Sequence, residues 1–160
     1  MVTQQQFQDF KTEAIKNQPI RKTIRLSELN FRTMDTVEYN GIYLGCNRQA
    51  LKDLFRILGM TQAAYSNLQS SLGEETSTSF LNTLKNAISS AKSLELTIAV
   101  TPDRVISRIE KAGQSSIISA DTYFDTFERL ANDHNLDIKF ADFNKGNGNI
   151  YLSTIAKGGE

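Results

Sequence analysis

Histidine, cysteine and tryptophan are scarce in this 160-residue chain, which has one histidine, one cysteine and no tryptophan. A single cysteine, Cys46, can form neither an internal disulfide nor the clustered thiolates of a zinc or iron–sulfur site. The only imidazole is that of His134, so no constellation of groups fills the roles that catalysis requires. We therefore expect no enzymatic activity, no metal and no cofactor, and a reducing compartment.

The chain also lacks net charge and long apolar segments, since 18 Lys and Arg residues balance 18 Asp and Glu. This balance argues against a polybasic protein that binds nucleic acid by bulk electrostatics, so a nucleic-acid site would be a local patch. No apolar run approaches the roughly 18 residues that span a bilayer, and the Gln-rich start, Met1 to Gln8, lacks the regions of a signal peptide. We expect a cytoplasmic protein with no membrane partner.

Prolines are scarce too: there are only two, and no Gly/Ser tract separates two halves, which favours one domain over residues 1–160. Periodicity and capping residues predict helices over 3–17, 48–58, 61–73, 76–91 and 121–130, and strands over 20–29, 36–37, 42–44, 94–100, 104–110, 115–119, 137–143 and 149–155. Because antiparallel hairpins and helices are mixed rather than alternating, the fold class is α+β. The loop-like end, 156–160, also allows this chain to be the N-terminal part of a longer one.

Three features suggest chemistry but have simpler structural explanations. His134 lies in a polar helix end, where a cation complements the helix dipole. Cys46 precedes a predicted helix, and its simpler role is that of a small buried hydrophobe. The carboxylates of Asp121, Asp125 and Glu128 share one helix face, but no second cluster completes a magnesium site, and an acidic first turn with Glu128 solvated accounts for them.

A helix-turn-helix interpretation is possible for the segment from Leu51 to Leu68. Such domains require Gly where Ser70 stands and a basic recognition helix. Here the next helix begins with Glu74 and Glu75, which would repel phosphates. The segment therefore gives little support to duplex-DNA binding.

The segment from Lys16 to Arg32 carries the clearest charge signal, with five cations against one acid, Glu28. Cations on a strand face with aromatic neighbours suit single-stranded nucleic acid, because bases stack on aromatic rings while cations follow the backbone. The alternative is a protected edge strand, since Lys and Arg on an exposed edge discourage association. The candidate phosphate contacts are Arg21, Lys22, Arg25 and Arg32, and the candidate stacking residues are Phe31 and Tyr43.

Short motifs follow one another between Ile42 and Leu130. They are Gly45-Cys46-Asn47-Arg48-Gln49-Ala50-Leu51, the helix end Leu58-Gly59-Met60, the step Ala63-Ala64-Tyr65, the helix from Phe80 to Ala91, the strands Leu94–Val100 and Arg104–Glu110, and Ile117-Ile118-Ser119-Ala120-Asp121-Thr122-Tyr123. In this order they resemble the phage/plasmid-like proteins of unknown function encoded on bacteriophages and mobile elements. The chain differs from them in having Thr61-Gln62 for a proline and an extra Ala120. The resemblance implies a phage or mobile-element origin and carries over no catalytic residues.

Two functions fit these observations. The first is a non-enzymatic phage or mobile-element protein that binds single-stranded nucleic acid through the basic strand, in the host cytoplasm. The second is a virion structural, assembly or cargo protein that contacts other phage proteins or its own copies. Residues 61–160 carry 9 basic and 12 acidic residues, so a basic N-terminal side could meet an acidic side of a second copy in a heterologous homo-oligomer.

Overall fold

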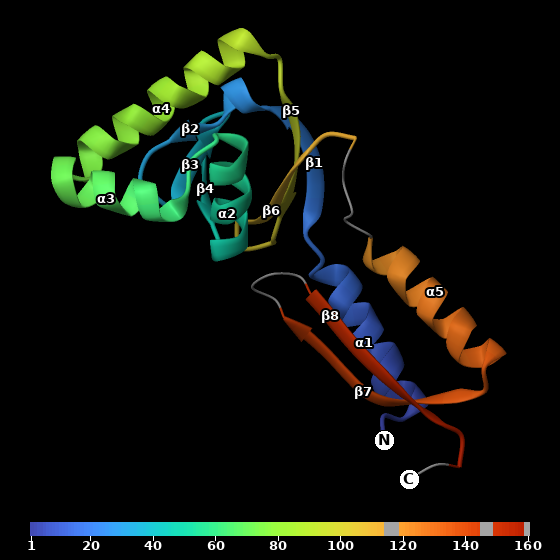
Figure 1. Cartoon of the computed structure of the whole chain (residues 1–160). Coiled ribbons are helices and arrows are strands. Elements are labelled where there is room, and N and C mark those ends of the chain that lie inside the picture. Colours follow the sequence, from blue (N-terminus) through green and yellow to red (C-terminus); the bar gives the residue numbers. More distant parts are fainter. Residues whose placement is uncertain (114–118, 145–148, 159–160) are drawn as a thin grey trace. The chain divides into compact units, whose positions relative to one another are not determined.

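The computed structural model describes residues 1–113, 119–144 and 149–158, and the chain divides into two compact units (Figure 1). Unit 1 consists of Met1–Gln18 and Ser116–Glu160, and unit 2 of Pro19–Ser115. Helices and mostly antiparallel strands are mixed in the chain, which confirms the α+β class. The division into compact units does not decide the number of domains, so the single domain expected from the sequence stays a prediction. None of the helices in the described ranges is long and apolar enough to cross a membrane.

A six-stranded sheet forms the centre of unit 2, in the order β1-β5-β6-β4-β3-β2. Its strands are β1 (Ile20–Arg25), β2 (Asn30–Phe31), β3 (Thr36–Tyr39), β4 (Ile42–Cys46), β5 (Glu95–Val100) and β6 (Val105–Lys111). Neighbouring strands are antiparallel except β4 and β6, which run parallel over two residue pairs. The order leaves β1 and β2 as the edge strands of this sheet.

Local turn chemistry sets the ends of several strands. The predicted hairpin at Asn40-Gly41 joins β3 to β4, and both residues have positive φ, 50° and 77°, as its turn type requires. The predicted strand over 20–29 is too long. After Arg25 the chain forms a 3-10 turn, η1 (Leu26–Glu28), because Leu26 and Leu29, three residues apart, are both buried.

Three consecutive helices complete unit 2: α2 (Arg48–Ile57), α3 (Gln62–Leu72) and α4 (Glu74–Ala91). The predicted caps are confirmed for the first two, since Asn47 and Thr61 each accept a hydrogen bond from a backbone N–H of the first turn. The third helix begins at Glu74, earlier than predicted. Gly73, with φ of 84°, lets the chain pass from α3 into α4 within one residue.

The main core of unit 2 lies on one face of the sheet. Strand residues Ile24, Leu96, Ile98, Ile106 and Ile109 are buried there together with helix residues. From the helices come Leu51, Leu54, Phe55, Tyr65 and Leu81, and Phe55 and Tyr65 stack with ring centroids 5.3 Å apart. Successive strand residues point to opposite faces, so this core identifies which face each remaining side chain occupies.

The helix α4 closes the β2 edge of the sheet. The side-chain amide of Asn82 accepts a hydrogen bond from the Phe31 N–H at 2.8 Å and donates one to the Phe31 carbonyl at 3.0 Å, as a neighbouring strand would. One turn further on, Lys85 is 1% exposed, and its ammonium group donates to the Ser27 carbonyl and to Asn30 Oδ1 at 3.3 and 2.9 Å. Burial lowers the pKa of Lys85.

Unit 1 packs two helices against one face of a two-stranded sheet. Its elements are α1 (Gln4–Lys16), α5 (Ala120–Asp133), β7 (Leu136–Asn144) and β8 (Asn149–Ala156). Its core contains Phe7, Ala14, Ala120 and Phe124, against which strand residues such as Ile138 and Leu152 pack. This confirms the predicted pairing of the last two strands.

Two details of unit 1 differ from the predictions. Ser119, not Asp121, caps α5, because its hydroxyl accepts from the Thr122 N–H. Glu128 is not simply solvated, since it accepts a hydrogen bond from Lys11 Nζ at 3.0 Å. All but the last residue of the predicted strand 115–119, and the hairpin tip at 145–148, lie outside the described residues.

Candidate nucleic-acid interface

The basic segment singled out in the sequence forms β1, at the edge of the unit 2 sheet. Among the described strands, β1 pairs with β5 alone. Its side chains are exposed except that of Ile24. The Leu26 N–H bonds to the Leu94 carbonyl, so the alternating pattern of an antiparallel pair directs the peptide groups of Thr23 and Arg25 away from β5. The edge-strand position considered in the sequence analysis is therefore confirmed.

The three cations of β1 do not share a face. Ile24 points into the core opposite Leu96, so Arg21 and Arg25 point to the other face of the sheet, the outer face. Lys22 lies on the core side, opposite Ile98, and its ammonium group lies 5.1 Å from the centre of the Tyr39 ring. Arg21 and Arg25 thus share one face and Lys22 lies on the other, so the prediction that all three cations line a single strand face is wrong for Lys22.

Two of the predicted contact residues lie at the far edge of the sheet, on β2 and just after it. Phe31 is 2% exposed, within the core, and its backbone is held by Asn82, so it has no ring face available for a base. The stacking role predicted for Phe31 is wrong, because burying the apolar ring in the core stabilises the fold more than leaving it exposed to solvent. Arg32 forms an ion pair with Glu38, and four strands lie between β1 and β2.

Tyr43 is the predicted aromatic residue that remains accessible. It is 60% exposed on β4 and, alternating with the buried Leu44, points to the same outer face as Arg21 and Arg25. Strands β5 and β6 lie between it and β1, a separation of three strand spacings or about 14 Å. A ligand that reached both groups would therefore cross the strands.

Sequence reasoning missed a further cation on the outer face, Arg108 of β6. Residue Ala99 of β5 stands opposite Arg21 on one side and opposite Arg108 on the other, so the two arginines flank a small residue in one cross-strand row. A register shift between Ala99 and Val100 accounts for the oversight. It lets Ile106 and Ile109, three residues apart, both enter the core, which strict alternation would forbid.

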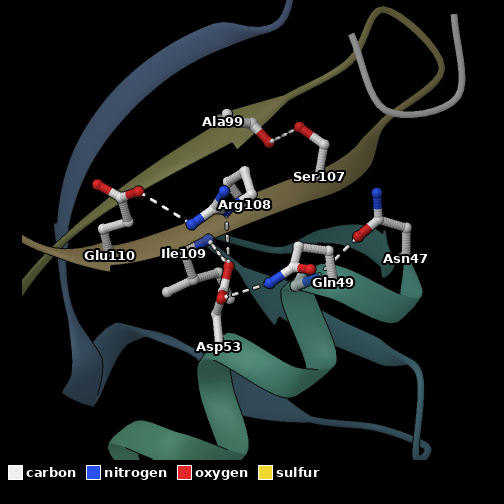
Figure 2. Close-up of polar contacts among 9 residues, drawn as sticks. Asn47, Gln49, Asp53, Ala99, Ser107, Arg108, Ile109 and Glu110 are labelled. Carbon is white, nitrogen blue, oxygen red and sulfur yellow. Dashed lines mark hydrogen bonds and ion pairs between the residues drawn. The ribbon is translucent and has the colours of Figure 1, made fainter. Parts of the chain in front are cut away.

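Arg108 is held in place by a buried carboxylate, that of Asp53 in α2 (Figure 2). Asp53 is 3% exposed, and its Oδ2 accepts hydrogen bonds from Arg108 Nε at 3.1 Å and from the Ile109 N–H at 3.0 Å. Its Oδ1 accepts from Gln49 Nε2 at 3.0 Å. Arg108 Nη2 donates to Glu110 Oε1 at 3.1 Å.

Chain topology explains why this carboxylate lies in the interior. Strand β4 ends at Cys46, and α2 begins at Arg48, so β4 runs beside only the first part of β6. Beyond that point the Ile109 N–H has no strand carbonyl to bind, and the Asp53 carboxylate supplies the acceptor. The same carboxylate then needs a counter-charge, which Arg108 provides.

Acidic side chains reduce the positive charge of the outer face. Glu95 stands opposite Arg25 in the β1–β5 register, and Glu110 pairs with Arg108. Arg21 has a further interaction partner of its own. The outer face of unit 2 therefore combines three arginines, two glutamates and one exposed tyrosine, which favours a ligand recognised by a few oriented contacts over one held by bulk charge.

The two residues considered for catalysis occupy structural positions. Cys46 lies in the core, where burial and the neighbouring Asp35 carboxylate raise the pKa of the thiol to about 12. It is therefore a protonated thiol at neutral pH. His134 is exposed at the C-cap of α5, as its simpler explanation predicted.

Comparison with protein-family models, with curated proteins and with solved structures found no match to this chain. The resemblance to phage/plasmid-like proteins therefore stays a prediction.

Proposed function

We propose that this protein is a non-enzymatic binding protein that takes single-stranded nucleic acid on the outer face of unit 2. The observation that carries the proposal is the placement of Arg21 and Arg25, both exposed, on one face of β1, which is an edge strand among the described strands. Arg21 and Arg25 are four residues apart, so their Cα atoms lie about 13 Å apart with Thr23 between them, and the two guanidinium groups form a spaced basic row. One guanidinium group can bind two oxygens of a phosphate at once, which suits arginine to a nucleic-acid backbone.

Two other residues extend this surface across the sheet. Arg108 lies in the same cross-strand row as Arg21, and its guanidinium is oriented by Asp53 and Glu110. Tyr43 offers an exposed ring on which a base can stack. Single-stranded nucleic acid is favoured over duplex because its bases are free to reach that ring. The proposal retains the phage or mobile-element origin and the host cytoplasm as the setting.

The experiment is a salt-dependent titration of labelled single-stranded and duplex oligonucleotides. We expect tighter binding of the single strand. The plot of log affinity against log salt concentration has a negative slope. Alanine at both Arg21 and Arg25 should reduce the magnitude of that slope by about 1.4, since each phosphate contact of a single strand contributes about 0.7. The matched control is Lys22→Ala, which removes a cation from the same strand on the opposite face.

Two outcomes would contradict the proposal: no binding at low salt, or an equal loss of affinity for Lys22→Ala. Because Arg21 has a further interaction partner, thermal unfolding of each variant must accompany the titration. Lysine at positions 21 and 25 keeps the charge and should retain most of the binding. If this charge-preserving variant binds no better than the alanine variant, the positive charge is not what binds.

A second function, assembly with copies of itself or with other phage proteins, is favoured by the distribution of charge between the units. Unit 1 carries nine acidic and six basic residues, whereas unit 2 carries nine acidic and twelve basic ones. Phe140 and Tyr151, which are 50% and 46% exposed, also lie on one face of the β7–β8 sheet. Light scattering should then show oligomers that dissociate as salt is raised, and a monomer at every salt and protein concentration would contradict self-assembly.

A further inference from the structure

A groove between α2 and β6 has a volume of about 350 Å³ and is lined by three cations, two acids and two isoleucines. The cations are Arg56, Arg108 and Lys111, the acids are Asp53 and Glu110, and Ile57 is the more accessible isoleucine. This volume lies at the lower end of the range for small-molecule sites. A compact ligand, or one group of a larger ligand, would fit.

Within the described part of the chain, the two acids of the groove bind one of its three cations. Both acids bind Arg108: Asp53 accepts from its Nε, and Glu110 accepts from its Nη2. Arg56 and Lys111 are exposed, and within the described part of the chain neither forms an ion pair. Two cations at the rim thus remain available to a ligand, beside a third whose position is fixed.

The two partners of Arg108 fix its orientation but use only part of its hydrogen-bonding capacity. A guanidinium has five N–H groups, and the hydrogen bonds to Asp53 and Glu110 use two of them. Asp53 is buried and also bound by the Ile109 N–H, so it fixes the direction in which the remaining donors point. A preoriented guanidinium loses little conformational entropy on binding an oxyanion.

We infer that this groove binds a phosphate monoester. A phosphate monoester has three terminal oxygens and close to two negative charges, which matches three cations converging on one small space, whereas a carboxylate offers two oxygens and one charge. Ile57, the more accessible isoleucine of the lining, is the apolar side chain that the ester group can contact. The inference goes beyond the proposed function, because a phosphate in the groove needs no contact with β1. A free mononucleotide and the terminal phosphate of an oligonucleotide present the same chemistry.

The test uses the full chain labelled with ¹⁵N and titrated with adenosine 5′-monophosphate. We expect saturable shifts of the Ile109, Glu110 and Lys111 amide resonances, none with adenosine, and none with sodium chloride at matched ionic strength. Oligonucleotides with and without a 5′-phosphate form a second arm. Preference for the phosphorylated strand identifies a strand end as a source of the phosphate, and equal binding of the two restricts the site to free monoesters.

Variants separate the groove from surface charge in general. Arg56→Ala and Lys111→Ala should each weaken monoester binding by about tenfold, the usual size of one charge-assisted contact. Lys52→Ala removes an exposed cation from the same helix outside the groove and should change nothing. Because Arg56 lies at the C-terminal end of α2, where a cation also complements the helix dipole, Arg56→Lys serves as the folded, charge-preserving comparison and should restore most of the affinity.

Shifts that do not saturate, or an equal loss for Lys52→Ala, would overturn the inference. The variant with alanine at Arg21 and Arg25 distinguishes it from the proposed function. If that variant loses oligonucleotide binding but binds the monoester normally, both stand. If the wild type binds oligonucleotides through β1 but shows no monoester binding, the groove inference alone fails.

Discussion

Replacing Asp53 by alanine should destabilise unit 2 by about 3 kcal/mol, through the loss of an acceptor that the fold cannot replace. The carboxylate is 3% exposed and accepts three hydrogen bonds, from Ile109, Arg108 and Gln49. The largest contribution comes from the buried Ile109 N–H, which loses its partner at a cost of about 1–3 kcal/mol. Arg108 is 41% exposed and can regain water, so losing its ion pair adds only about 1 kcal/mol.

The conservative variant Asp53→Asn separates these contributions. Its amide oxygen can still accept from the Ile109 N–H, while the charge that holds Arg108 is gone. We expect a loss of about 1 kcal/mol, clearly smaller than that of the alanine variant. The ordering of the two variants is therefore as informative as either value.

Urea unfolding followed by far-UV circular dichroism measures both effects, since the chain has no tryptophan. Lys52→Ala, which removes the exposed neighbouring side chain on α2, should stay within about 0.5 kcal/mol of wild type. A loss below about 1 kcal/mol for Asp53→Ala would refute the reasoning, because an unsatisfied buried N–H costs at least that much. An equal loss for the asparagine variant would show that the charge, and not the acceptor, stabilises the fold.

Three further predictions concern other sites. Burial lowers the pKa of Lys85 below its unfolded value of 10.5, so the unfolded chain binds the extra proton, and the unfolding free energy of wild type relative to Lys85→Met should rise as pH approaches 10.5 in urea titrations. The pKa of Cys46 is raised from 9.0 to about 12, so its contribution to stability is complete below pH 9 and is lost between pH 9 and 12; the wild-type advantage over Cys46→Ala should shrink across that window, and a constant difference would contradict the shift. Gly41 has φ of 77° with open space around it, so Gly41→Ala should cost about 1 kcal/mol from backbone strain alone, measurable as a lower urea midpoint.

Local signals in the sequence predicted the parts of the fold that depend on neighbouring residues. The Asn40-Gly41 turn and the caps at Asn47 and Thr61 were predicted because each is a contact within four residues. The cap of α5 was misplaced by two residues, since Ser119 and Asp121 are both good capping residues and only tertiary packing chooses between them.

The candidate site was only partly predictable, because its geometry depends on strand order and register. Strand alternation correctly predicts that Arg21 and Arg25 are exposed. The accessible position predicted for Phe31 is wrong, because no residue near Phe31 in the sequence shows that α4 covers β2. Strict alternation along β6 would place Arg108 on the same side as the buried Ile106, and only the register shift opposite Ala99 reverses this. The interior position of Asp53 follows from where β4 ends, which no residue near Asp53 indicates.

The two edges of the unit 2 sheet are finished differently, and this limits how the sheet can grow. At β2 the Asn82 amide already occupies the backbone positions that an incoming strand would need. At β1 the peptide groups of Thr23 and Arg25 point away from β5 and bond to no other strand within the described ranges, but the cations of β1 would face the same cations of a second copy. Repeated strand addition needs two compatible edges. Edge-to-edge growth of this sheet into a continuous fibre is therefore blocked at β2 by the Asn82 amide and at β1 by repulsion between like cations.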